Sequence, residues 1–252
     1  HTRSICVTGV QTCALPISIA ATAETVDLVV RDGVIYDGRG GAPVRGDVAV
    51  RDGRIVAIGR LSDYTGKQEV RANGLAVAPG FINVLSWATE SLIQDGRGMS
   101  DVKQGVTLEI FGEGGSPGPV NAALRDEMLK TQGDIRYDIP WTTLGEYLEF
   151  LTKKGVSPNV ASFVGATTVR AHELGFEDRA PTAQELMRMQ DLVRQAMREG
   201  ALGVGSSMIY APASYAKTDE LVALVKAAGE FGGGYISHIY MEIGRASCRE
   251  RV

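Results

Sequence analysis

Apolar and polar residues alternate over the first third of the chain, and the alternation is interrupted by dipeptides that favour turns. Three segments share this character: residues 26–38 around Asp32-Gly33, residues 47–59 around Asp52-Gly53 and residues 68–79 around Asn73-Gly74. A period of two is typical of strands with one buried face, and Asp-Gly or Asn-Gly is typical of hairpin turns. The pattern predicts a small antiparallel β domain over residues 19–78.

Beyond Pro79 short apolar strands alternate with amphipathic helical segments. The predicted strands cover residues 81–87, 107–113, 159–168, 201–210 and 234–240. Capping boxes, in which a threonine precedes a glutamate by three residues, predict helix starts at Thr182 and Thr143. The first of these helices places Leu186, Met189, Val193 and Met197 on one face. A further helix is predicted from Thr218 to the glycines at 232–234.

Strands that alternate with helices indicate βα units on a parallel sheet. Five strands fit either a doubly wound sheet or part of a (β/α)8 barrel, which takes about 250 residues. The glycine-rich segment 112–117 departs from the dinucleotide-binding pattern at Pro117. We therefore predict an α/β fold in which residues 79–241 form the first five strands of an incomplete TIM-like barrel.

Both ends of the chain differ in character from the rest. Residues 7–17 and 242–252 back-translate without a gap into sequences that resemble short-read sequencing adapters. We interpret residues 1–18 and 242–252 as adapter-like scars and leave them out of the fold prediction. All three cysteines lie in these ends. The segment between them therefore offers no disulfide, thiolate metal site or cysteine nucleophile.

Charge and hydropathy limit the classes of partner. Without the two ends, which hold four arginines and two glutamates, the net charge changes from −4 to −6. No basic stripe is present to neutralise phosphates, so we expect no nucleic acid partner. No other run is long or apolar enough to span a bilayer. The small residues at 21–23 resemble a signal-peptide cleavage site, which leaves a cytoplasmic and a periplasmic or secreted location both open.

Catalytic groups in a barrel lie at the carboxyl ends of its strands. His238 is near the end of the last predicted strand, where imidazole is a good zinc ligand, although a hydrogen-bonded core histidine fits the same position. Glu113 ends the second strand between glycines, where its carboxylate can approach a metal or anchor the loop. Metal binding and structural roles therefore stay open for both residues.

Two further residues are candidates for contact with substrate. Arg170 carries a planar fork suited to a carboxylate, but a surface ion pair is its commoner use. Tyr210 can donate to a carbonyl, or it can pack at the rim of the barrel. The sequence contains neither the nucleophile elbow of serine hydrolases nor a H-E-x-x-H zinc motif. No catalytic residue is therefore assigned.

The motifs taken in order resemble one known family. They are VxDGxIxxIG, VAPGFIN, QGVTLEIFGEG, VASFVGATTVRA, GALGVGSSMIYAP and GGGYISHI. Together they are similar to the D-aminoacylase, or N-acyl-D-amino-acid deacylase, family of the amidohydrolase superfamily, over almost all of residues 26–240. The resemblance implies a (β/α)8 barrel, a small β domain built from both ends of the chain, and a zinc site. In such enzymes a metal-activated water attacks an amide carbonyl, and an aspartate on the last strand handles the proton.

The resemblance carries over unevenly to the ligand positions. His238 falls where the family has a metal-binding histidine on strand five. Leu85 and Trp87 fall on the strand-one His-x-His and cannot bind zinc. Gly114, beside Glu113, stands in place of a ligating cysteine, and Ala166 stands in place of a histidine after strand three. The strand-six histidine and the strand-eight aspartate would lie beyond residue 241. At most one metal is therefore expected, held by His238 with Glu113 as a second candidate.

Two functions remain open for the complete protein. The first is a hydrolase of non-peptide C–N bonds, similar to an N-acyl-D-amino-acid deacylase, with an altered metal site and a small N-acylated amino acid or related amide as substrate. The second is a non-catalytic amidohydrolase-like barrel that binds a small acylated ligand. The resemblance implies an enzyme, and we expect the 252-residue chain by itself to be inactive.

Overall fold

The computed structural model describes residues 23–238, and these divide into two compact units between Pro79 and Gly80. Each unit has its own buried apolar cluster. Both adapter-like ends, residues 21 and 22 of the predicted cleavage site, and residues 239 and 240 of the last predicted strand lie outside the described residues.

The first unit is a five-stranded sheet. Its strands are β1 (Glu24–Ile35), β2 (Val44–Arg51), β3 (Arg54–Gly59), β4 (Tyr64–Arg71) and β5 (Ala76–Val77). The pairings β1–β2 and β2–β3 are antiparallel, as expected from the sequence. β4 and β5 instead pair parallel to β1, so the predicted hairpin around Asn73 is wrong. The turn there lets the chain pass from one parallel partner of β1 to the next.

The predicted turn at Asp32-Gly33 is a β-bulge within one long strand. The register of β1 against β2 shifts between Val30 and Gly33, and Asp32 has a φ of 53°. The Asp47 carboxylate accepts a hydrogen bond from the backbone N–H of Asp32 at 2.9 Å. A Cβ on Gly33 would lie 2.5 Å from the Val77 side chain. The Asp-Gly dipeptide, with Asp32 in the left-handed region, therefore forms a bulge instead of a hairpin turn.

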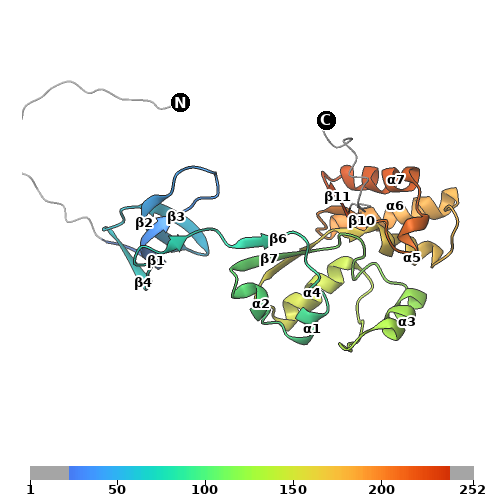
Figure 1. The fold of residues 1–252 in the computed structure, drawn as a ribbon, viewed down its shortest axis with the longest axis horizontal. Helices are drawn as coiled ribbons and strands as arrows, with labels where there is room; N and C mark the ends of the chain where they lie inside the picture. The colour runs from blue at the N-terminus through green and yellow to red at the C-terminus, as the bar shows by residue number, and fades with distance from the viewer. Residues whose placement is uncertain (1–22, 239–252) are drawn as a thin grey trace, which may run out of the picture. The chain divides into compact units, whose positions relative to one another are not determined.

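The second unit contains two parallel three-stranded sheets (Figure 1). The strands are β6 (Phe81–Asn83), β7 (Val106–Phe111), β8 (Asn159–Ser162), β9 (Val164–Gly165), β10 (Gly203–Ser207) and β11 (Gly234–His238). Their spatial orders, β6-β7-β8 and β11-β10-β9, place sequence neighbours side by side. All five predicted strands are confirmed, with the third divided at Phe163 into β8 and β9. The described strands do not close into a barrel.

Helices connect these strands. They are α1 (Ser91–Gln94), α2 (Met99–Val102), α3 (Ala122–Thr131), α4 (Leu144–Lys154), α5 (Ala166–Leu174), α6 (Ala183–Arg198) and α7 (Thr218–Gly229), with a 3-10 turn at Ala213–Tyr215. Both predicted capping boxes form, at Thr143 and at Thr182. Residues 166–168, predicted as the end of a strand, are instead the first turn of α5. Figure 1 shows α5, α6 and α7 gathered around β10 and β11.

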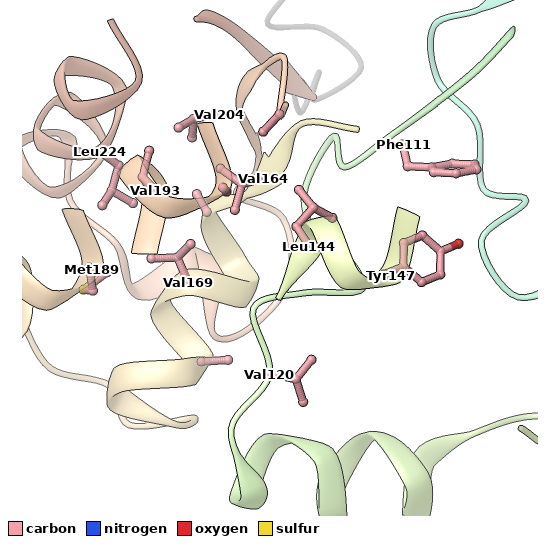
Figure 2. Packing of buried hydrophobic residues seen from close by; sticks show 14 of the residues in the cluster. Phe111, Val120, Leu144, Tyr147, Val164, Val169, Met189, Val193, Val204 and Leu224 are labelled. Atoms are coloured by element: carbon pink, nitrogen blue, oxygen red, sulfur yellow. The ribbon is translucent and has the colours of Figure 1, made fainter. Parts of the chain in front are cut away.

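The core of the second unit lies between these helices and the parallel strands. Met189 and Val193 of α6 are fully buried, and Leu186 and Met197 pack against the same cluster. Val164 of β9 and Val204 of β10 meet this helical layer (Figure 2). The predicted apolar face of α6 is therefore confirmed, and it fixes one side of the strands whose carboxyl ends carry the candidate site.

Candidate functional site

A cavity of about 340 Å³ lies at the carboxyl ends of the parallel strands. It is lined by Trp87, Glu113, Gly114, Gly115, Thr167, Ser207, Ile209, Tyr210, Ala213 and His238. These residues come from the segments that follow β6, β7, β9 and β10 and from the last residues of β10 and β11. The structure therefore brings together three of the four candidate site residues, His238, Glu113 and Tyr210.

The two candidate metal ligands face each other in this cavity. His238 Nδ1 lies 3.3 Å from Glu113 Oε1. The Glu113 side chain is 11% exposed, whereas that of His238 is 48% exposed. A largely shielded carboxylate thus stands beside a half-open imidazole, an arrangement that can orient the ring, hold a proton or contribute to a metal site.

Glycines allow the loop after β7 to approach the neighbouring strands closely. A Cβ on Gly114 would lie 2.7 Å from the Ser207 side chain, and one on Gly165 would lie 2.5 Å from the Gly114 carbonyl oxygen. Gly112 has a φ of +92°, and a Cβ there would lie 2.0 Å from the Phe163 carbonyl oxygen. These contacts hold Glu113 at the cavity wall.

The segment after β6 lines the same region with apolar groups. The Ser86 backbone N–H donates to the Ile110 carbonyl at 2.9 Å, which fixes the flanking Leu85 and Trp87 beside β7. Neither side chain carries an atom that binds zinc. Within residues 23–238 no group of three or more His, Cys, Asp or Glu side chains could hold a metal. The described residues therefore supply His238 and Glu113 but not a complete zinc site, which needs at least three protein donors.

Tyr210 lines the cavity at its exposed rim, with 73% of its surface accessible. Arg170 has a different position. It is fully buried in α5, and its guanidinium donates to the Glu220 carboxylate of α7 at 2.6 Å and to the Arg179 carbonyl at 2.6 Å. The Arg179 guanidinium in turn binds the Glu185 carboxylate at the start of α6. The fork of Arg170 is thus engaged between helices, outside the residues that line the cavity.

Sequence reasoning missed a second, larger cavity of about 380 Å³ in the same unit. Its wall includes Tyr137 and Trp141 from the loop before α4 and Tyr147 from α4 itself, which follow no single periodic pattern. Burial, together with the neighbouring Glu90 carboxylate, raises the pKa of the Tyr137 hydroxyl to about 12. These aromatic residues share the cavity with the segments that follow β6 and β7, a juxtaposition that depends on the tertiary fold.

Comparison with known proteins shows similarity to D-aminoacylases. The chain is 32% identical over 221 residues to the D-aminoacylase of Alcaligenes xylosoxydans xylosoxydans, a match that covers 86% of this chain and 45% of that protein. The chain is homologous to the D-aminoacylase family of amidohydrolases. No family model matches it. Because the match covers 45% of this D-aminoacylase, the chain spans less than half of its length.

Solved structures of D-aminoacylase relatives agree with this assignment. A D-aminoacylase described as having a binuclear metal center, with one-metal activation and second-metal attenuation, has a TM-score of 0.75 at 29% identity. The N-acyl-D-glutamate deacylase of Bordetella bronchiseptica, complexed with zinc and a phosphonate inhibitor, has a TM-score of 0.72 at 31% identity. The matches cover 85% and 86% of this chain, and 45% of each solved chain. They confirm the α/β architecture of parallel strands preceded by a small sheet.

The membrane prediction can be checked within residues 23–238. In that part of the chain no helix is both long and apolar enough to cross a membrane.

Proposed function

We propose that the complete protein is an amidohydrolase that cleaves the amide bond of an N-acylated D-amino acid. One observation carries the proposal: the chain, homologous to D-aminoacylases, places His238 and Glu113 3.3 Å apart in a cavity at the carboxyl ends of its parallel strands. The carboxyl ends of barrel strands are where barrel enzymes assemble their active sites. The products would be a carboxylic acid and a free D-amino acid.

The contact between Glu113 and His238 suggests a separate role for each side chain in the site. Glu113 lies at Nδ1 of His238, which leaves Nε2 for another partner. A carboxylate that accepts from one ring nitrogen fixes the tautomer and orientation of a histidine that binds metal through the other. Glu113 would then position His238, and Tyr210 at the rim would donate to the substrate.

The same geometry supports an altered, single-metal site. Relatives contain zinc, and one-metal activation is described for a D-aminoacylase. When bound, zinc would supply a Lewis acid and an activated water. Leu85 and Trp87 remove two of the family's ligand positions, so any metal on His238 needs further donors from outside residues 23–238. We derive no reaction step through it.

Zinc content is the direct test of the ligand assignment. The complete protein is expected to carry about one zinc per chain, because His238 is a donor and the strand-one pair is absent. His238→Ala should remove most of the metal, whereas His172→Ala, on α5 and outside the cavity lining, should leave it in place. Elemental analysis of the purified proteins gives the answer. A wild type without stoichiometric zinc, or unchanged metal in His238→Ala, would show the assignment to be wrong.

Hydrolysis itself is tested with the two enantiomers of an N-acetyl amino acid and the complete protein. Release of the D-amino acid but not of the L-amino acid is expected, and Glu113→Gln should lower kcat by 10-fold to 100-fold, roughly the effect of losing a carboxylate that orients a metal-binding histidine. If the protein binds the D-substrate without releasing product, it is a binding relative and the hydrolase proposal fails.

A further inference from the structure

The second cavity shares part of its wall with the first. It is lined by Leu85, Ser86, Trp87, Thr89, Glu90, Ile93, Gly112, Glu113, Gly115, Ser116, Pro117, Met128, Tyr137, Trp141 and Tyr147. Trp87, Glu113 and Gly115 line both cavities. A molecule held at His238 and Glu113 therefore has a second space of about 380 Å³ beside it.

The wall of this second cavity presents aromatic carbon. The rings of Tyr137 and Trp141 stack with centroids 6.3 Å apart, and Tyr147 meets the edge of Trp141 at 5.0 Å. Their polar atoms are already bonded. The Tyr147 hydroxyl donates to the Thr89 carbonyl at 3.0 Å, and the Trp141 indole N–H donates to the Pro117 carbonyl at 2.8 Å. Tyr147 and Trp141 are almost fully buried, at 0% and 2% exposed, and back this wall, so a ligand meets the rings of the half-buried Tyr137 and the exposed Trp87.

The charges at this cavity have one sign. Glu90 and Glu113 are the charged side chains among its described lining residues, and no lysine, arginine or histidine is among them. The Tyr137 hydroxyl donates to Glu90 Oε1 at 3.2 Å, which holds this carboxylate and leaves its second oxygen for another donor. Aromatic surface combined with carboxylate is favourable for an organic cation and unfavourable for an anion.

We infer that this cavity binds a cationic group, an amine or guanidinium carried on an alkyl or aryl chain, with Glu90 as its counter-charge. The assignment of that group to the substrate rests on the proposed function. The substrate would then be an N-acylated amino acid whose side chain or acyl group is basic. Relatives named as N-acyl-D-aspartate and N-acyl-D-glutamate deacylases are named for amino acids of the opposite charge.

Tryptophan fluorescence tests the binding without any turnover. The chain has two tryptophans, Trp87 and Trp141, and both line this cavity. The 252-residue chain is titrated at pH 7 with three matched probes: 2-phenylethylamine, 2-phenylethanol and phenylacetate. The amine should bind about tenfold more tightly than the alcohol, since a desolvated cation–π contact adds to the charge pair. Phenylacetate should bind most weakly.

Three variants locate the effect. Glu90→Gln keeps the acceptor for Tyr137 and should abolish the preference for amine over alcohol. Met128→Phe, which fills the cavity, should weaken both, whereas Leu129→Phe on the same helix but outside the lining should change neither.

Three results would overturn the inference: equal affinity for amine and phenylacetate, an amine preference that survives Glu90→Gln, or no change in fluorescence with any probe. Failure of hydrolysis in the complete protein, with the amine preference intact, would remove the proposed function but not this binding site.

Discussion

Replacing Glu220 by alanine is expected to lower the free energy of unfolding by about 3–5 kcal/mol, because it leaves the Arg170 charge buried without its partner. Arg170 is 0% exposed and Glu220 is 5% exposed, and their side chains are 2.6 Å apart. The pair links α5 to α7. Urea denaturation of the 252-residue chain, followed by far-UV circular dichroism, measures the loss.

An exposed pair provides the matched control. Glu149 and Lys153 lie 3.1 Å apart on the surface of α4. Glu149→Ala should change the free energy of unfolding by less than about 0.5 kcal/mol, since exposed ion pairs contribute little. Similar small changes for both variants would show that Arg170 has no structural role and would restore it as a candidate for binding substrate.

Gly205→Ala is expected to destabilise the protein by about 3 kcal/mol, at the upper end of overpacking effects. A Cβ on Gly205 of β10 would lie 1.9 Å from the Gly112 carbonyl oxygen, and the backbone of Glu113 is the next neighbour. The added methyl group must push β10 away from the loop that carries Glu113. Denaturant titration measures the stability, and the complete protein should lose zinc as Glu113 moves away from His238.

Gly229→Ala serves as the comparison because it adds the same methyl group where it has space. Gly229 ends α7, and nothing lies within 4 Å of a Cβ placed on it. Alanine favours the helix over glycine by up to about 1 kcal/mol, so this variant should be neutral or slightly more stable. If Gly205→Ala were equally harmless, close approach of β10 to the Glu113 loop would not be a requirement of the fold.

The parts of the fold predicted correctly are those that local patterns encode. Alternating strands, the apolar face of α6 and the capping boxes at Thr143 and Thr182 depend on residues a few positions apart. The choice of pairing partner for each strand is not encoded by such local patterns. The direction in which β4 pairs with β1 depends on contacts more than thirty residues apart, and Thr167 favours a strand by its branched side chain although Gly165 has already ended β9.

The residues of the candidate site also include some that local sequence position predicts and some that only the tertiary fold brings together. His238, Glu113 and Tyr210 were found because a position at the carboxyl end of a predicted strand places a side chain at one edge of the sheet. Arg170 lies just beyond such a strand end, yet the first turn of α5 carries it into the protein, where Glu220 neutralises it. The aromatic cavity is formed by residues of several loops and helices, and no local periodicity predicts that they come together.

The contacts of Arg170 continue outward: its guanidinium pairs with Glu220 and donates to the Arg179 backbone carbonyl, and the Arg179 side chain pairs with Glu185. The two ion pairs differ in their sensitivity to ionic strength. At 1 M salt the screening length is about 3 Å, which weakens exposed pairs but spares buried ones. Concentrated salt would therefore weaken the Arg179–Glu185 pair at the start of α6 while the buried Arg170–Glu220 pair keeps α5 attached to α7. The helices beside the candidate site are thus held by one ion pair that is insensitive to salt, Arg170–Glu220, and by one that salt weakens, Arg179–Glu185.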